Sequence, residues 1–566
     1  MPRRLFQFEL YLSLGWFFLC IIVSSCWCRT TASEIGAVFD EPTYLEQGLK
    51  RWRTGECKGL MRLGTMTLPV DVQTLPIYLW ERYRGKPFDP EADLHQVLPV
   101  ARAMTLFFWS LLLTYAWLAG RRLAGPWAGA LAVALIAFEP SYLAHASLAT
   151  TDIAISACLL ALVYHFAVGR ESSWIWRRAV PAFWFGAAMA AKASGLVFGP
   201  VCLFAVELER LHRQGVLGQI YQGHLLPSLY EAWVQLRPFR RDFCWIFGGG
   251  MAVLFIYTGC DWQAEPSFVK WANNLPEGSL KTVMVPIAEN LCIFSNAGEG
   301  LIQQVKHNVR GHGTYLLGKT YRRACWHYFW ILPTIKLSLT LLFLPIVLLL
   351  LRPKALLNWA VMPAALLFAL CPLFRVQIGI RLILPFLSLF VIGFAAAAVQ
   401  VVRMLAPTWA KATLVALLAL GVGWSAASSY RACPNTLCYI NELWGGTPNG
   451  YQLVSDTDYD WGQGLKELAE WQKTNGISSL KVWYFGTDSA LHTMPVEEVR
   501  LHMLPIQDES DVAQAVGNGY FAASTTLLYG GYCNSPAAKT SVEFLRACKP
   551  VARTTTFFIY DFRNRQ

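Results

Sequence analysis

Eight ionisable residues interrupt the apolar segments of this chain at positions that share one side of a membrane. If those segments cross a bilayer in alternating directions, the eight residues fall at one face, and the arginine pairs between segments fall at the other. A charge within the bilayer costs about 2.5–3.5 kcal/mol, so such charges usually mark a function. The pattern predicts a catalytic or binding chamber at one face, formed by Asp40, Glu41, Glu139, Asp152, Lys192, Lys336, Arg375 and Arg381.

The acidic residues of this group suit proton transfer. Asp40 and Glu41 precede Pro42, a dozen residues after the first apolar segment, and Asp152 follows two threonines at the start of another. A carboxylate that is partly desolvated at the mouth of an apolar chamber gains basicity and can accept a proton from a hydroxyl nucleophile. The same positions are also typical of helix starts, where acidic residues cap the first turn. Both interpretations stay open at this point.

The basic residues suit recognition of an anion. Lys192 lies among alanines and before Gly195, which leaves room for a ligand, while Lys336 and Arg381 interrupt two later apolar segments. Long cationic side chains can also reach the membrane surface along their stems, which explains one such residue more easily than three. Three cations at one leaflet favour binding of an anionic head group, above all phosphate.

A glycine-punctuated loop supplies further candidates for substrate binding, namely His312 and Tyr315, beside Tyr44 from the first acidic motif and Arg375. Loop histidines can act as acids, bases or ligands, but they are more often surface residues. In the tail, Asp456, Asp458 and Asp460 have calcium-loop spacing, yet Trp461 replaces the glycine that such a loop requires. We therefore predict no metal site, although the sequence does not exclude a divalent cation.

Composition places the chain in the membrane. Of its 566 residues, 55% are hydrophobic and 15% are charged, whereas a soluble domain has about 25% charged residues. The net charge of +11 lies largely in short loops, which is typical of membrane topology and not of nucleic-acid binding. About eleven crossings of a mainly α, polytopic helical bundle are predicted, at 10–28, 99–119, 124–143, 150–168, 181–194, 196–208, 243–260, 326–351, 355–372, 378–402 and 412–428.

The crossings divide the chain into two predicted domains. Residues 1–429 form the transmembrane catalytic domain, with outer loops at 29–98 and 261–325, and residues 430–566 form a small mixed α/β domain. Because Lys and Arg concentrate on the inner side, the N-terminus is expected inside, with the chamber and the tail outside. Within the tail we expect a helix at 464–474 and strands at 480–487, 520–525 and 555–562. Four cysteines there could form disulfides in an oxidising compartment.

Taken in order, these motifs resemble the GT-C superfamily of membrane glycosyltransferases, which use lipid-phosphate sugars. Phe39 to Tyr44 resembles the first acidic motif, Thr150-Thr151-Asp152 the second, Ala191 to Gly195 the lysine motif, and Gly379 to Pro385 the late arginine segment. The closest resemblance is to protein O-mannosyltransferases and lipid A aminoarabinose transferases, in a bacterial branch that also carries the Gly311-His312 and Asp460-Trp461-Gly462 motifs. It extends over nearly the whole chain.

The resemblance implies an inverting hexosyl or pentosyl transfer from a polyprenyl-phosphate carrier to a hydroxyl of a protein, lipid or glycan. Asp40 would be the general base, supported by Glu41, and Asp152 would position a substrate. Lys192, Lys336 and Arg381 would hold the carrier phosphate, with no cofactor required. The location implied is a bacterial inner membrane, with the active site on the periplasmic side.

The main alternative is a secondary transporter or lipid flippase for an anionic lipid-linked substrate. Such a protein would bind its substrate near the membrane midplane and often consists of repeated halves. Here the charges gather toward one face and no repeat is evident. An enzyme is therefore the favoured interpretation.

Overall fold

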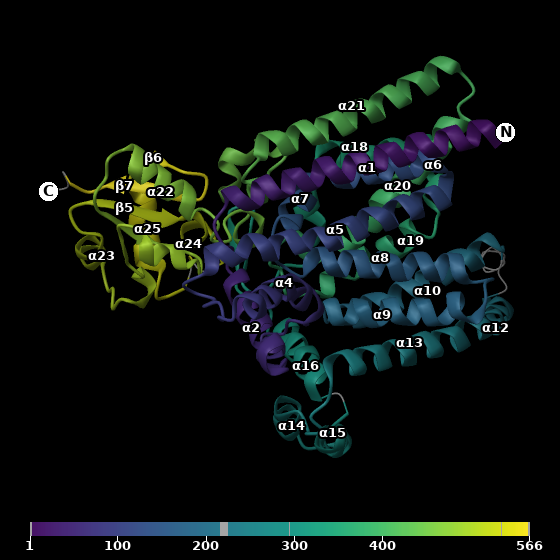
Figure 1. Ribbon diagram of the computed structural model, residues 1–566, viewed down its shortest axis with the longest axis horizontal. Helices are drawn as coiled ribbons and strands as arrows, with labels where there is room; N and C mark the ends of the chain where they lie inside the picture. Colours follow the sequence, from purple (N-terminus) through teal and green to yellow (C-terminus); the bar gives the residue numbers. More distant parts are fainter. Residues whose placement is uncertain (1–2, 216–224, 294, 532, 534, 564–566) are drawn as a thin grey trace.

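The computed structural model describes residues 3–215, 225–293, 295–531, 533 and 535–563. Long helices run along one direction and a small sheet domain covers one end of them, while the N-terminus lies at the opposite end (Figure 1). The predicted class, a mainly α helical bundle with a small mixed domain near the C-terminus, is confirmed.

Five of the described helices are long and apolar enough to cross a membrane, and two bent helix pairs raise the number to as many as seven. The bent pairs are α6 with α7 (Pro126–Ala137, Pro140–Ala146) and α17 with α18 (Tyr328–Lys336, Leu339–Leu351), at 70° and 112°. The straight helices are α1 (Arg3–Glu34), α5 (Leu94–Ala124), α8 (Asp152–Gly169), α20 (Leu384–Met404) and α21 (Thr408–Ala432).

The four other predicted crossings also fold as helices, which are shorter or less apolar: α9 (Val180–Ala191), α10 (Gly195–Arg213), α13 (Arg237–Thr258) and α19 (Val361–Leu370). The expected break between the fifth and sixth segments occurs at Lys192–Ser194, where Lys192 is extended. Gly195 is required at this break, because a Cβ there would lie 2.6 Å from the backbone of Ala188. The small residues therefore let the two helices pack closely and hold Lys192 between them.

At the end of the bundle away from the sheet domain, several arginines converge on one acid. Arg170, Arg177 and Arg178 all donate to the buried carboxylate of Asp242, at 2.7–2.8 Å. This ionic network therefore joins α13, which carries Asp242, to the end of α8 and to the short helix Ile175–Ala179 before α9. The short helix α12 (Leu225–Gln235) precedes α13 in this region.

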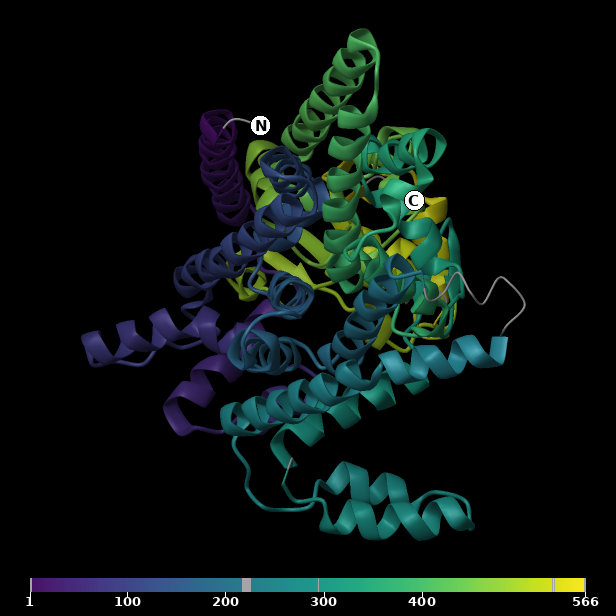
Figure 2. The same cartoon turned by 90° about the vertical axis from the view of Figure 1, so that its right-hand side faces the viewer.

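The segments between crossings form small helices near the sheet end of the bundle. Figure 2 shows one pair of them, α14 and α15, as a hairpin that projects from the body. The first segment, residues 29–98, contains α2 (Glu41–Thr54), α3 (Lys58–Arg62) and α4 (Leu68–Arg84). The second segment, residues 261–325, contains α14 (Pro266–Asn273), α15 (Ser279–Asn290), α16 (Ser295–Arg310) and the hairpin β1–β2 (Thr314–Leu316, Lys319–Tyr321).

The tail forms a five-stranded mixed sheet in the order β4-β3-β5-β7-β6. Its central strand β5 is parallel to β3 and antiparallel to β7. The expected helix and three strands are present as α22, β3, β5 and β7. The elements are α22 (Leu465–Thr474), β3 (Leu480–Trp483), β4 (Val496–Glu498), α23 (Glu509–Val516), β5 (Tyr520–Ser524), α24 (Thr525–Tyr529), α25 (Lys539–Ala547), β6 (Ala552–Arg553) and β7 (Phe557–Asp561).

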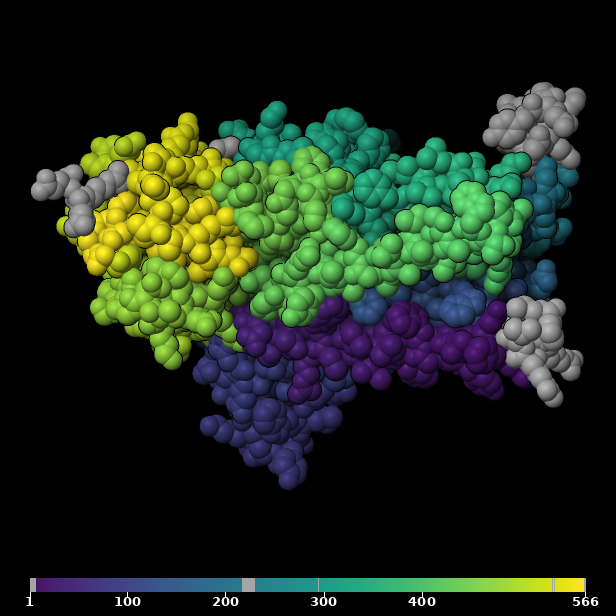
Figure 3. Space-filling view, turned by 90° about the horizontal axis from the view of Figure 1, so that it is seen from above, coloured from purple at the N-terminus to yellow at the C-terminus, as the bar shows by residue number. Residues whose placement is uncertain are grey.

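The sheet domain packs directly on the bundle end (Figure 3). Backbone hydrogen bonds join it to the first segment, from Gly36 N–H to the Gln463 carbonyl at 2.8 Å and from Phe39 N–H to the Trp461 carbonyl at 2.9 Å. All fifteen cysteines of the chain are free thiols, including the four in the tail. Noncovalent contacts therefore fix the sheet domain against the residues that precede Asp40.

Candidate functional site

A polar cavity of about 340 Å³ lies between the bundle and the sheet domain. Regions far apart in sequence meet there, among them the start of α2, the start of α8, the α9–α10 break, the turn before α20, α16 with the loop after it, and the tail. Among its lining residues are Asp40, Tyr44, Thr151, Lys192, His307, His312, Arg381, Asp456 and Trp461. We refer to this space as the polar cavity.

A chain of ion pairs connects the predicted acids and bases. The Arg381 guanidinium lies 3.1 Å from Asp40 Oδ2 and 3.9 Å from Asp152 Oδ2. On its other side Asp152 accepts a hydrogen bond from Lys192 Nζ at 2.6 Å. The Asp152 side chain is fully buried, whereas those of Asp40 and Lys192 keep 25% and 21% of their surface exposed. The two cations are thus fixed by Asp152, and Asp40 is open to a ligand.

Arg381 is positioned by the tail segment that precedes α22. Its guanidinium stacks over the Trp461 ring at 4.2 Å, and the neighbouring Ile380 N–H donates to Asp458 Oδ1 at 2.9 Å. Gly379, at φ 114°, permits this approach, because a Cβ there would overlap the Thr457 hydroxyl. Arg381 Nε is buried without a hydrogen-bond partner among the described residues. One donor of the guanidinium therefore remains for a ligand.

Asp456 is a cavity residue that the sequence analysis did not place in the site. It is half-buried and takes a left-handed backbone conformation with φ 57°, which is costly for a residue other than glycine. Desolvation raises the pKa of Asp456 to about 7; Arg381 opposes this shift and Asp40 adds to it. The local signal for Asp456 and Trp461 is the acidic tail motif, whose spacing resembles a calcium loop and does not by itself indicate the cavity.

Tyr44 and His312 lie in the polar cavity as expected. The Tyr44 hydroxyl is 3.4 Å from Asp40 Oδ2, and burial raises its pKa, so it stays a proton donor. His312 Nδ1 lies 2.9 Å from the Gly313 carbonyl, which can only accept, so Nδ1 carries the proton. Burial lowers the pKa of both His307 and His312. These two rings face the cavity as neutral imidazoles near neutral pH.

Glu41 lies outside the cavity, in a fully buried ion pair with Arg102 at 2.6 Å and 2.8 Å. Its carboxylate also accepts hydrogen bonds from the N–H groups of Val38 and Ala149. The pair therefore joins the start of α2, next to Asp40, to α5. Through Ala149 it also joins α2 to the turn before α8, next to Asp152. Arg102 was missed, although it is a charged residue within a predicted crossing.

Four other predicted residues lie outside the polar cavity, and one of them, Glu139, is buried and accepts a hydrogen bond from the Ser338 N–H at 3.0 Å. Lys336 is 2% exposed, and its ammonium donates to the carbonyls of Leu437, Tyr439 and Asp458 at 2.7–2.8 Å. Tyr315 is buried and donates to the Gln452 carbonyl at 3.2 Å, and Arg375 is exposed on the surface. The contacts of Lys336 and Tyr315 join the tail to α17 and to β1.

An apolar groove of about 300 Å³ adjoins the polar cavity. The two spaces share Lys192, Gln304, Val376, Arg381 and Leu382. The remaining walls are mostly aliphatic and aromatic, from Ile155, Leu196, Val197, Phe198, Leu301, Val305, Val309, Phe374 and Pro385. Two cations thus stand where an apolar groove meets a polar cavity, an arrangement that suits an anionic amphiphile.

The tail carboxylates are engaged in hydrogen bonds and not grouped for a cation. Asp458 accepts from Tyr328 and Ile380, and Asp460 accepts from Thr525 and Thr526. Within the described part of the chain, no three His, Cys, Asp or Glu residues are arranged to hold a metal ion. Lys192 and Arg381 are the positive charges available to an anion in this cavity.

No family model matches the sequence, and no curated protein matches it significantly. Solved structures do match. ArnT from Cupriavidus metallidurans bound to undecaprenyl phosphate is 13% identical, with a TM-score of 0.41 and coverage of 96% of this chain and 97% of that one. The apo Archaeoglobus fulgidus oligosaccharyltransferase is 11% identical, with a TM-score of 0.47 and coverage of 92% and 70%.

A third match, AglB from Archaeoglobus fulgidus with an inhibitory peptide and a dolichol-phosphate, is 10% identical, with a TM-score of 0.43 and coverage of 96% and 74%. The identities and TM-scores are too low to assign a substrate or a residue role to this chain.

Proposed function

We propose that this protein is an inverting glycosyltransferase of a bacterial inner membrane that moves a sugar from a polyprenyl-phosphate carrier to an acceptor hydroxyl. The carrier would be of the chemical kind bound in the ArnT and AglB structures. The observation that carries this proposal is the junction of cavity and groove, where Lys192 and Arg381 stand beside Asp40. The prenyl chain would lie in the groove and the sugar in the polar cavity, which opens outside the cell.

In the proposed reaction, Asp40 accepts the proton of the acceptor hydroxyl as its oxygen attacks the anomeric carbon. The bond between that carbon and the phosphate oxygen breaks. The sugar is thereby joined to the acceptor oxygen with inverted configuration, and polyprenyl phosphate is released. Lys192 and Arg381 stabilise the charge that grows on the phosphate. Asp152 fixes both cations, and Tyr44 supplies a hydrogen bond beside Asp40. No general acid is required, because phosphate is a competent leaving group.

Glu41 and Lys336 have supporting roles in this proposal. Glu41 positions Asp40 through its contacts with Arg102 and Ala149, and Lys336 fixes the tail segment that carries Asp456 and Trp461. Both act through the backbone and not on the carrier.

The test is a screen of purified full-length protein with several polyprenyl-phosphate sugars and a mixture of hydroxyl-bearing acceptors, measuring release of free carrier. Release that requires Asp40 and Arg381 supports the proposal. Movement of lipid-linked sugar between the leaflets of a vesicle, with no carrier release, would instead establish a flippase.

A further inference from the structure

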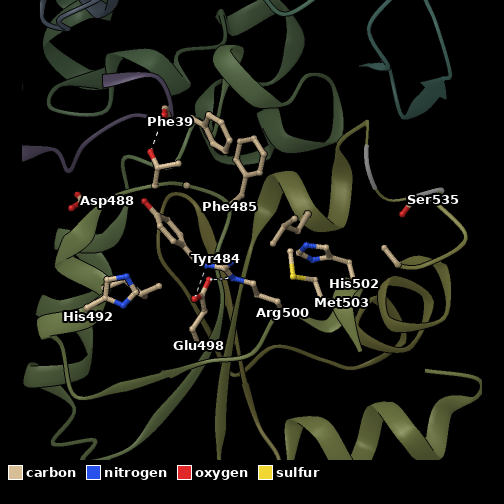
Figure 4. A pocket seen from close by; sticks show the side chains of 15 residues that line it. Phe39, Tyr484, Phe485, Asp488, His492, Glu498, Arg500, His502, Met503 and Ser535 are labelled. Atoms are coloured by element: carbon tan, nitrogen blue, oxygen red, sulfur yellow. Dashed lines mark hydrogen bonds and ion pairs between the residues drawn. The ribbon is translucent and has the colours of Figure 1, made fainter. Parts of the chain in front are cut away.

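A second and larger cavity, of about 520 Å³, lies within the sheet domain. It is bounded by the loop after β3, by β4 and the turn that follows it, and by Phe39 from the first segment. Its volume falls in the range of about 300–1,000 Å³ that is typical of small-molecule sites. We refer to it as the tail cavity (Figure 4).

The tail cavity meets the polar cavity at a pair of aromatic rings. Phe39 and Phe485 line both spaces, and their rings stack at 5.5 Å with an interplanar angle of 24°. The backbone of Phe39 is held on both sides, by its N–H on the Trp461 carbonyl and by the Thr487 hydroxyl on its own carbonyl at 2.8 Å. Asp40 follows directly in the chain. The two spaces therefore meet one residue before the proposed base.

The walls of the tail cavity combine aromatic faces with planar polar groups. Glu498 and Arg500 form a two-point ion pair at 2.7 Å and 3.0 Å, and Figure 4 shows His492 and His502 on either side of it. His502 Nδ1 accepts a hydrogen bond from Trp483, so in the neutral ring the other nitrogen is a donor. Arg500 keeps 51% of its side chain exposed. Donors and acceptors of both charges are thus available beside aromatic rings.

We propose that the tail cavity binds the acceptor of the transfer and that this acceptor is a neutral or weakly charged saccharide; this inference rests on the proposed function. A sugar ring presents apolar C–H faces to aromatic rings and hydroxyls to planar polar side chains. The charge of Arg500 is balanced by Glu498, which disfavours a strongly anionic acceptor. A saccharide hydroxyl that passes the Phe39–Phe485 boundary would give its proton to Asp40 and receive the sugar.

A polypeptide acceptor is the competing class. Strand β4 is an edge of the sheet, and an extended peptide can pair with such an edge through its backbone. That mode would use the N–H and C=O groups of β4 and little of the cavity interior. The two classes are therefore separated by substitutions that fill the cavity or remove its polar groups and leave the strand intact.

The experiment is ligand-observed saturation-transfer NMR on the full-length protein in nanodiscs. The probes are maltotriose, chitotriose, mannotriose and a short Ser/Thr-containing peptide. Met503→Trp fills the cavity, with Leu504→Trp as its control, because Leu504 is also exposed but does not line the cavity. Arg500→Ala removes the polar pair; its control is Arg563→Ala, which breaks a similar exposed pair with Asp561 elsewhere in the domain.

We expect at least one trisaccharide to give a signal that falls fivefold or more in Met503→Trp and Arg500→Ala and is kept in both controls. Signals from the peptide alone, no saccharide signal at millimolar probe, or equal signals in all variants would overturn the inference. Binding of polyprenyl phosphate is measured on the same samples. Carrier binding without saccharide binding contradicts this inference alone, whereas saccharide binding without carrier binding contradicts the proposed function.

Discussion

At the scale of single residues, Asp40 differs from Asp152 in being partly exposed and in pairing with a single cation. Asp152 is fully buried between Lys192 and Arg381, which leaves it no room to accept a proton from an incoming hydroxyl. Asp40 contacts Arg381 and the Tyr44 hydroxyl, and 25% of its side chain is exposed. The proposed roles of Asp40 as base and of Asp152 as positioning acid rest on this difference.

Asp40→Asn should therefore lower turnover by about 10²–10⁴-fold, the usual contribution of a general base. Binding of the donor should change little, because the cations remain fixed by Asp152. Carrier release and donor binding are measured on the same preparation, with Glu46→Gln, an exposed acid on α2, as the control. Turnover near that of the unaltered protein would remove Asp40 as the base.

Asp456 makes binding of an anion dependent on pH. With its pKa near 7, this carboxyl is neutral below that value and becomes a negative charge in the cavity above it. His307 and His312, whose pKa values are lowered by burial, stay neutral in this range. The affinity for a carrier phosphate should therefore fall as pH rises through 7.

We expect the affinity to fall roughly threefold to tenfold between pH 6.5 and 8. This change corresponds to a repulsion of about 0.7–1.4 kcal/mol between the ionised Asp456 and the phosphate. The ligand is a polyprenyl phosphodiester, which keeps a single charge over this range. Asp456→Asn should bind it with an affinity that does not vary with pH. A pH dependence that persists in this variant would assign the effect to another group.

At the scale of elements, the turn between Gly379 and Leu382 decides whether Arg381 faces the groove. It is held from the tail by Asp458 and Thr457, which accept from Ile380 N–H and donate to the Ile378 carbonyl, respectively. The tail segment therefore sets the position of a bundle residue. The sheet domain and the turn before α20 therefore both contribute to the polar cavity.

Gly379→Ala should displace the turn, because the new Cβ would meet Thr457 at a backbone conformation with φ 114°. We expect at least a tenfold weaker affinity for polyprenyl phosphate, measured by carrier binding in detergent. Gly298→Ala is the control, since a Cβ there meets nothing within 4 Å. Equal affinities in the two variants would show that the turn does not position Arg381.

At the scale of the whole molecule, the buried pair of Glu41 and Arg102 joins the first segment to the bundle. Removing one partner of a buried pair costs about 3–5 kcal/mol, because the other charge is left uncompensated. Glu41→Gln should therefore destabilise the protein strongly, as measured by unfolding in a denaturing detergent. Glu56→Gln, which breaks an exposed pair with Lys50, should cost no more than about 1 kcal/mol. Similar losses in both variants would contradict this role of Glu41.

The membrane orientation is tested by cysteine labelling from one side of sealed vesicles. Ser172 lies in an exposed loop between α8 and α9, and Asn518 is exposed in the sheet domain at the other end of the bundle. A cysteine at each position, in a chain whose exposed Cys26 and Cys244 are replaced, should be labelled from opposite sides. Labelling of both from the same side would contradict the proposed topology.

The sequence by itself determined the helical class, the break at Lys192, the tail strands, and the residues Asp40, Asp152, Lys192 and Arg381. These followed from local properties, namely apolar length, β-branched content and the cost of charge within apolar segments. The same signal also selected Glu41 and Lys336, because burial of a charge is costly whether its partner is a ligand, another side chain or a backbone carbonyl.

Only the tertiary structure decided which kind of partner each of these buried charges has. It paired Glu41 with Arg102, surrounded Lys336 with three carbonyls, and left Arg381 and Lys192 at the edge of a groove. It also brought Asp456 and Trp461 into the cavity from more than seventy residues beyond Arg381. Contacts between residues so distant in sequence leave no local pattern, since they depend on how the helices and the sheet domain pack.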